Sequence, residues 1–489
     1  MLQLKCPAQN YAWGRKPAGA NGRKGSEVAA LVEGSGGEVE SSKPYAELWM
    51  GTHPSGPAVV DGTEGQTLAS WIAANPCALG SIAPLFGNDM PFLFKVLSVE
   101  TALSIQSHPD KALAQRLHAK SPDVYKDANH KPEMAIAITD FEALCGFVPH
   151  HELTEALKEV PELREVVGDV AASAVETTGS KAALKAAFGI LMTADPVKVG
   201  TAVTALESRL KAIQKGGARP LTDKEELVLR LNAQYPQDVG VLSAFFLNLV
   251  KLHAGQAIYL AANVPHAYIS GELVECMATS DNVIRAGLTP KLRDTAVLCE
   301  SLTYERGPPT ILNGNAVPGR PWTTVYSPPF DEFEVEHVSI PEKARFQGIQ
   351  TFLPANPGPQ VFVVRAGTGQ AYLRNPPSDN LSSILHKDIK LHTGSVVFVP
   401  AKTPVKLEAT DDGLDVWIAA VNPQAFQDAR LMAGKAVEAA ESAVGSWLLM
   451  LVLGVVLALL WAKLTNNLEP LQSHFSKLLS HASTVKQPT

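Results

Sequence analysis

Two stretches, Ser104-Ile-Gln-Ser-His-Pro-Asp110 and Asn129-His-Lys-Pro-Glu-Met134, place an amide, an imidazole and a carboxylate close together in the sequence. Gln106 and His108 are two residues apart, and residues with this spacing point to the same face of a β-strand. Glu133 comes from the second stretch, just after a proline that favours an extended backbone before it. The sequence therefore predicts three metal ligands at the end of a strand, with a fourth ligand still to be supplied.

The ligand types indicate which metal the site would bind. An imidazole, a carboxylate and an amide oxygen suit zinc, whereas an all-oxygen cage for calcium or magnesium would not need a histidine. On the Gln-x-His pattern alone, polar residues that merely cap a strand end explain the sequence equally well.

Longer motifs show a resemblance to a known family. The run from Pro91 to Ala137, together with Tyr11-Ala-Trp-Gly14, 44–54 and the segment from Asn263 to Lys291, resembles type I mannose-6-phosphate isomerase. This family, also called phosphomannose isomerase, consists of zinc-dependent cupin enzymes. The resemblance covers roughly residues 1 to 422.

The resemblance implies a complete site. It implies one zinc ion per chain, and the ligands it implies are Gln106, His108, Glu133 and His266. Arg285 is implied as a catalytic residue, because a permanently charged guanidinium can stabilise an enediolate. For the catalytic base we expect Glu275 first, since its apolar neighbours would raise its pKa. Lys131 and Asp281 remain alternatives. Residues expected to bind substrate or shape the pocket are Ser104, Lys95, Lys291, Asp281, Trp13 and Glu47.

The implied reaction interconverts mannose 6-phosphate and fructose 6-phosphate by proton transfer through an enediolate, in the supply of GDP-mannose. A metal supplies the Lewis acid that such a transfer needs. Two other functions remain open. A cupin with two histidines and a carboxylate could be a metal-dependent oxygenase, and a membrane-tethered cupin could bind sugar phosphates without catalysis.

Composition narrows the range of partners and compartments. The chain has 489 residues, 46% of them hydrophobic, and a net charge of −7, which argues against a nucleic-acid partner. Its five cysteines are scattered and form no Cys-x-x-Cys pair, which argues for a reducing compartment. The N-terminal residues lack the pattern of a secretory signal, so we expect cytosolic catalytic domains. We expect a monomer.

The predicted fold is mainly β, with two cupin or jelly-roll barrels, an α-helical insertion and a C-terminal transmembrane helix. Apolar residues at helical spacing define the insertion, and Thr222-Asp-Lys-Glu225 has the form of a capping box. Gly- and Ser-rich residues 17–42 predict a loop. The predicted order is a first catalytic part (1–149), the helical insertion (150–248), a second catalytic part (249–310), a metal-free cupin (311–422), a linker helix (423–441), the transmembrane helix (442–462) and a polar tail (463–489).

An internal repeat supports the two barrels without any family knowledge. Residues 255–266 align without gaps with 394–405, each with a glycine, an apolar strand, a polar turn and a proline at the same offset. His266 in the first copy corresponds to Val405 in the second. We therefore expect the second barrel to have lost this metal ligand.

The C-terminal region carries a membrane signal. Residues 442–462 contain no charge and could cross a bilayer core of about 30 Å. Trp447 and Trp461 are placed to mark its two interfaces. The sequence thus predicts a tail-anchored protein on an intracellular membrane, with its catalytic domains in the cytosol.

Overall fold

The computed structural model describes residues 1–19, 24–217, 219–342, 350–374 and 385–427. Contacts divide the chain into the units Met1–Ala425 and Phe426–Thr489, and the first unit contains all elements discussed below. The predicted linker helix at 423–441 lies largely outside the described residues, and the predicted transmembrane helix and tail lie wholly outside them. Among the described residues, no single helix is long and apolar enough to cross a membrane, although the bent pair Lys181–Thr193 and Pro196–Gly216 meets both criteria jointly.

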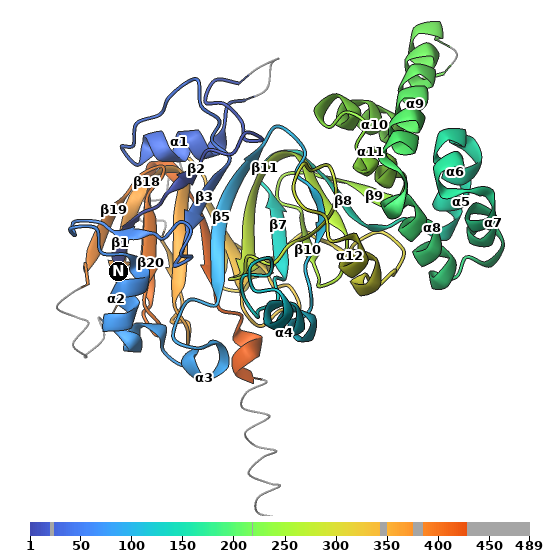
Figure 1. The fold of residues 1–489 in the computed structure, drawn as a ribbon. Coiled ribbons are helices and arrows are strands. Elements are labelled where there is room, and N and C mark those ends of the chain that lie inside the picture. Colours follow the sequence, from blue (N-terminus) through green and yellow to red (C-terminus); the bar gives the residue numbers. More distant parts are fainter. Residues whose placement is uncertain (20–23, 218, 343–349, 375–384, 428–489) are drawn as a thin grey trace, which may run out of the picture. The chain divides into compact units, whose positions relative to one another are not determined.

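The first unit is mainly β, as predicted, and the described strands form two large antiparallel sheets (Figure 1). The first sheet contains eleven of these strands: β2 (Ala8–Gln9), β3 (Glu47–Met50), β5 (Phe92–Val99), β6 (Ile105–Ser107), β7 (Glu133–Ala137), β8 (Phe141–Phe147), β9 (Leu247–Leu252), β10 (Ala257–Leu260), β11 (His266–Ala278), β12 (Ile284–Gly287) and β13 (Ile311–Leu312). The predicted metal ligands lie on this sheet or directly beside it.

Strand β11 organises the first sheet because it pairs with different strands along its length. Its first residues pair with β6 and β8, where His266 lies opposite Gln106 and Cys145. Its second half pairs with β5 and β7. Apolar side chains from β5 and from β7 to β11 form one core between these two parts. His266 therefore begins the part of β11 that pairs with β6 and β8.

The second sheet contains ten described strands: β1 (Leu2–Lys5), β4 (Val59–Val60), β14 (Asn315–Val317), β15 (Arg320–Tyr326), β16 (Glu334–Ile340), β17 (Gln350–Leu353), β18 (Gln360–Leu373), β19 (Asp388–Leu391), β20 (Val396–Val399) and β21 (Val405–Ala420). Leu2 pairs with Phe398, so the N-terminal strand β1 joins the second sheet and not the first. No sequence pattern had predicted that the N-terminal strand pairs with the second sheet.

The helices described are α1 (Glu27–Gly34), α2 (Leu68–Ala74), α3 (Ala83–Phe86), α4 (Lys111–Lys120), α5 (His150–Glu159), α6 (Pro161–Val167), α7 (Asp169–Thr178), α8 (Lys181–Thr193), α9 (Pro196–Gly216), α10 (Asp223–Gln234), α11 (Val239–Ser243) and α12 (Thr295–Ser301), with short 3₁₀ turns η1 (Pro76–Leu79) and η2 (Ala244–Phe246). Helices α5 to α11 form the predicted insertion, and Figure 1 shows them gathered at one end of the first sheet. The Thr222–Glu225 capping box is present at the start of α10.

Helix α1 corrects the loop prediction for residues 17–42. Ser26 caps this helix by accepting a hydrogen bond from the Ala29 backbone N–H. Val28 and Leu31 form the buried face of this helix. The Gly- and Ser-rich composition around the helix concealed its short apolar stripe.

The repeat predicted from sequence occupies equivalent places in the two sheets. Gly255 and Gly394 both adopt a left-handed backbone conformation, with φ of 85° and 84°. A four-residue strand follows each glycine, and the long strands β11 and β21 begin at His266 and Val405. Val405 is fully buried in an apolar cluster with Leu353. The second sheet thus has an apolar side chain where the first has an imidazole.

Candidate metal centre and active site

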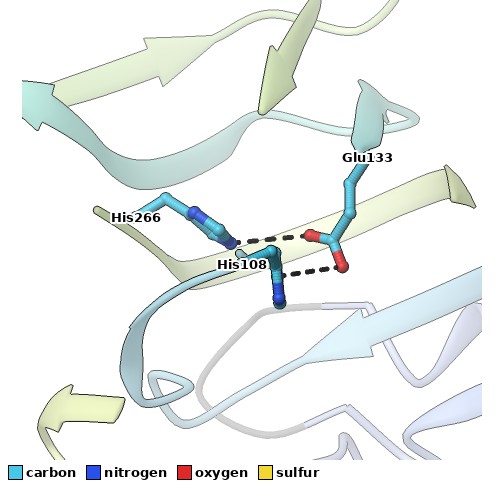
Figure 2. A group of neighbouring side chains, drawn as sticks. All are labelled: His108, Glu133 and His266. Atoms are coloured by element: carbon cyan, nitrogen blue, oxygen red, sulfur yellow. Dashed lines mark ion pairs between the residues drawn. The ribbon is translucent and has the colours of Figure 1, made fainter. Parts of the chain in front are cut away.

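Three residues from separate segments of the first sheet converge on one point (Figure 2). His108 follows β6, Glu133 begins β7 and His266 begins β11. His108 Nε2 lies 3.3 Å from Glu133 Oε1, and His266 Nε2 lies 3.5 Å from Glu133 Oε2. Within the described ranges, this is the one group of three or more His, Cys, Asp or Glu ligand atoms that lie within 4.8 Å of one another.

The donor atoms of this group fit a metal ion. His108 Nε2, His266 Nε2 and Glu133 Oε2 are buried, and none has a hydrogen-bond partner among the described residues. Buried polar atoms without a partner are costly, and coordination of a cation would satisfy all three. Two imidazole nitrogens and a carboxylate form a donor set suited to zinc and similar divalent metals.

Backbone carbonyls orient both imidazoles towards this point. His108 Nδ1 donates to the Asn282 carbonyl at 2.7 Å, and His266 Nδ1 donates to the Val264 carbonyl at 2.9 Å. These bonds place the proton of each neutral ring on Nδ1 and leave Nε2 free as a ligand. Burial lowers the pKa of His108 to about 4, which keeps this ring neutral at physiological pH.

The carboxylate of the group is ionised. Burial acts to raise the pKa of Glu133, but its polar neighbours, among them the charged Lys131, outweigh burial and hold this pKa well below its ordinary value. Lys131 Nζ lies 3.3 Å from Glu133 Oε1. The centre therefore offers two imidazole nitrogens and one charged carboxylate, a donor set that a divalent cation can bind.

The predicted fourth ligand, Gln106, lies beside the group on β6. Its backbone is in register with His266 on one side and with Arg285 on the other. The Ser104 hydroxyl lies 3.5 Å from Gln106 Oε1. Strand β6 ends at Ser107, one residue before the end we predicted at His108.

A cavity of about 700 Å³ opens onto the centre. Predicted site residues that line it are Trp13, Glu47, Lys95, Ser104, Gln106, Lys131, Glu133, Glu275, Asp281, Arg285 and Lys291. His108 and His266 do not line this cavity, so Glu133 is the member of the His–Glu–His group that reaches it. The structure thus brings together every substrate-binding and catalytic residue that the sequence predicted.

One wall of the cavity carries a buried ionic cluster centred on Lys95. Its Nζ lies 3.0 Å from Glu275 Oε2 and 3.3 Å from Glu47 Oε2. Burial acts to lower the pKa of Lys95, but the two carboxylates outweigh it and the pKa is raised. Lys95 therefore stays charged, and its charge is already balanced by neighbouring carboxylates.

Glu275, the predicted base, has the environment expected for it. Tyr268 donates to Glu275 Oε1 at 2.8 Å. Burial is the largest influence on this carboxyl and raises its pKa above the ordinary value, against the opposing charge of Lys95. A carboxylate with a raised pKa is a stronger base than an exposed one.

Two cations of the cavity have no carboxylate partner among the described residues. Arg285 is half-buried on β12, and partial burial lowers its pKa from the ordinary value, although a guanidinium keeps its charge. Lys291 lies further along the same segment and is exposed. These two side chains, with the Ser104 hydroxyl, give the cavity an uncompensated positive region.

The sequence analysis missed several residues that line the cavity. His53 is buried, and its Nε2 lies 3.2 Å from Asp281 Oδ1, which lowers the pKa of Asp281. Its Nδ1 accepts a hydrogen bond from the Ser55 backbone N–H. Both ring nitrogens are thus engaged, so His53 holds Asp281 at the cavity wall. Gln234 and Tyr235 of the helical insertion also line the cavity. Of these three residues, only His53 belongs to a motif quoted from the sequence.

The fold and the site define a mainly β metal-binding protein in which a His–Glu–His centre opens onto a cavity with positive charge. Family models agree with this description. "Phosphomannose isomerase type I, catalytic domain" matches residues 1–150, and "Phosphomannose isomerase type I, helical insertion domain" matches residues 163–247.

Individual proteins give the same result. The chain is 46% identical over 442 residues to mannose-6-phosphate isomerase 2 of Arabidopsis thaliana, covering 87% of this chain and 94% of that protein. It is 41% identical over 425 residues to mannose-6-phosphate isomerase of Mus musculus, covering 84% and 96%. The chain belongs to the type I phosphomannose isomerase family.

Solved structures share the fold. A mutant phosphomannose isomerase from Salmonella typhimurium matches with a TM-score of 0.70 at 28% identity, over 86% of this chain and 99% of that chain. A mannose 6-phosphate isomerase bound with zinc and yttrium matches with a TM-score of 0.70 at 27% identity over the same shares.

Proposed function

We propose that the chain is a zinc-dependent isomerase that interconverts mannose 6-phosphate and fructose 6-phosphate, with one zinc ion per chain. The observation that carries the proposal is the buried His–Glu–His group, whose unpartnered donor atoms adjoin a cavity with uncompensated cations. Mannose-6-phosphate isomerases with 40% identity or more to this chain support the choice of substrate.

Zinc would be held by Gln106, His108, Glu133 and His266, and the bound ion would act as a Lewis acid on the sugar oxygens. Glu275 would remove the proton from one carbon and return it to its neighbour, since this carboxylate is buried and its pKa is raised. Arg285 would stabilise the negative charge of the enediolate, because it is a cation in the cavity and has no carboxylate partner within the described part of the chain.

The remaining residues would bind and orient the sugar phosphate. Lys291 and Ser104 would bind the phosphate dianion, since no described residue forms an ion pair with Lys291, whereas Lys95 is already paired with two carboxylates. Lys131 would hold charge beside Glu133. Trp13, Glu47 and Asp281 would shape the cavity wall. The product would enter the supply of GDP-mannose.

A single experiment tests the proposal. Purified protein with quantified metal is assayed for conversion of mannose 6-phosphate before chelation, after chelation, and after zinc is added back. We expect activity to disappear with zinc and to return with it. Zinc-loaded protein that leaves mannose 6-phosphate unchanged would refute the proposal and favour a sugar-phosphate-binding role without catalysis.

We also infer finer features of the whole chain. Both sheets would be jelly-roll units of the cupin type, which the shared glycine, strand and turn positions support. The protein would be a monomer. Residues 442–462 would attach the catalytic unit to an intracellular membrane from its cytosolic side, and the uncharged sequence of that segment supports this attachment.

A further inference from the structure

An ion pair joins the second sheet to the active-site segment of the first. His130 Nε2 lies 2.5 Å from Glu332 Oε1, although the residues are 202 positions apart in the chain. Burial acts to raise the pKa of Glu332, but the hydrogen bond with His130 and other nearby groups outweigh burial and lower this pKa. Glu332 is therefore an ionised, buried acceptor, and charge-assisted hydrogen bonds of this kind are among the stronger ones in proteins.

Contacts on either side of Glu332 hold the segment that precedes β16 in place. Phe333 is fully buried, and the ring of Phe330 contacts Tyr259 edge to face, with 5.8 Å between the ring centroids. Asn422 Nδ2 donates to the Phe330 carbonyl at 2.8 Å and to a second carbonyl of the same segment. The chain on either side of Glu332 is thus fixed by a buried ring and by an amide that follows β21.

On the other side of the ion pair, His130 precedes Lys131, which carries one of the charges of the active site. Lys131 is 9% exposed, and its Nζ lies 3.3 Å from Glu133 Oε1. Pro132 has a restricted φ, and its carbonyl accepts a hydrogen bond from Ala278 N at 3.0 Å. The backbone of Lys131 is therefore fixed on its C-terminal side by Pro132 and on its N-terminal side by the ring of His130.

We propose that Glu332 is a positioning residue for isomerisation: by holding His130 it places the Lys131 amine against Glu133. This proposal rests on the proposed function, and it gives the second sheet a part in the reaction although this sheet lacks the metal ligands. The Lys131 amine lies beside Glu133 of the candidate metal site. It does not belong to the uncompensated positive region formed by Arg285 and Lys291. Loss of the ion pair should therefore act on the chemical step more than on phosphate binding.

The test compares three variants in the zinc-loaded, full-length protein. Glu332→Ala removes the acceptor. Glu332→Gln keeps the shape and one acceptor oxygen but removes the charge. Glu334→Gln is the matched control, because Glu334 lies two residues away and accepts a hydrogen bond from Ser327, with no contact to His130. Misplacement by about 1 Å can cost a hundredfold in rate, so we expect Glu332→Ala to lower kcat between about ten- and a hundredfold with little change in KM.

A second measurement follows Lys131 directly. Brief acetylation followed by mass spectrometry compares labelling of Lys131 with labelling of Lys95, which is equally buried but lies on β5. We expect Glu332→Ala to raise labelling of Lys131 severalfold and to leave Lys95 unchanged. Glu332→Gln should give a smaller change in the same direction, and Glu334→Gln should match the wild type.

Three outcomes would overturn the proposal. One is a wild-type kcat in Glu332→Ala, and another is an equal rise in labelling of Lys131 and Lys95, which would indicate general loosening. The third outcome applies if Glu332→Ala fails to fold. In that case a wild-type kcat together with wild-type labelling of Lys131 in Glu332→Gln would overturn the proposal. If the wild-type protein has no isomerase activity, the proposed function fails, whereas the labelling ratio still decides whether Glu332 positions Lys131.

Discussion

Replacement of the buried carboxylate Glu272 should change how stability depends on pH. Glu272 lies on β11, 1% exposed, with Oε1 at 2.9 Å from Arg15 Nη1 and with a hydrogen bond from the Ser98 hydroxyl. Burial raises its pKa from 4.5 to about 7, against the opposing effects of Ser98 and Arg15. The folded protein therefore holds this proton at pH values where the unfolded chain has released it.

The sign of the effect follows from linkage. Between pH 4.5 and about 7 the folded state binds more protons at Glu272 than the unfolded state does, so stability falls as the pH rises through this window. At about 1.36 kcal/mol for each pKa unit, the contribution amounts to roughly 2.5 kcal/mol between about pH 5 and about pH 8. Glutamine cannot titrate, so the Glu272→Gln variant should lack this pH-dependent contribution to the free energy of unfolding.

The assay is urea unfolding of the zinc-loaded wild type and of Glu272→Gln at both pH values. Histidines and other shared groups contribute equally to both proteins, so they cancel when the change with pH is compared. The wild type should lose roughly 2.5 kcal/mol relative to the variant on going to the higher pH. Exposed Glu64, replaced by Gln, is the control and should show no such difference. This prediction would be refuted if the stability of both proteins changed equally with pH, or if the wild type gained stability relative to Glu272→Gln at the higher pH. Either result would mean that Arg15 outweighs the effect of burial on the pKa of Glu272.

Three further predictions concern the metal, the chemical step and the C-terminal segment. His266→Ala should lose bound zinc in elemental analysis because it removes a buried donor atom, whereas exposed His253→Ala should keep it; full zinc occupancy in His266→Ala would refute the ligand set. Arg285→Ala should lower kcat by orders of magnitude, and a rise in KM alone would assign Arg285 to phosphate binding. A chain ending near Glu441 should be soluble without detergent and fully active, and loss of its activity would show that the removed segment belongs to the catalytic fold.

Local sequence patterns predicted much of the fold. The Gly255 and Gly394 repeat predicted two equivalent turns because glycine readily adopts the left-handed conformation that both positions have. Thr222 and Glu225 predicted the start of α10 because a capping box is formed by residues three apart. Such signals depend on neighbours in the chain, so they can be recognised in a single sequence.

Contacts between distant segments could not be predicted in this way. No local pattern indicates that Leu2 pairs with Phe398, or that Glu332 reaches His130. His53 stood in a recognised motif, but its bond to Asp281 depends on how strands meet in three dimensions. Residue spacing suggested Gln106, His108 and Glu133 as metal ligands, whereas the fourth, His266, came from the motifs of the family resemblance.

The strand register relates the candidate metal ligands of the first sheet to their counterparts among the described residues of the second. In the first sheet Glu133 pairs with Leu260, and in the second Gln360 pairs with Val399, which is the repeat equivalent of Leu260. Gln360 thus occupies the place of the candidate ligand Glu133.

Two further candidate ligands of the first sheet, Gln106 and His266, have apolar counterparts in the second. Gln106 pairs with His266, whereas Leu353 pairs with Val405 in the equivalent position. An unpaired buried carboxylate or imidazole is costly without a cation, while Leu353 and Val405 contribute apolar burial to the core of the second sheet. This replacement of charged and polar donors by a neutral amide and two aliphatic side chains supports the proposal of one zinc ion per chain. In our proposal, the second sheet contributes to the site of the first through Glu332, which positions Lys131 by holding His130.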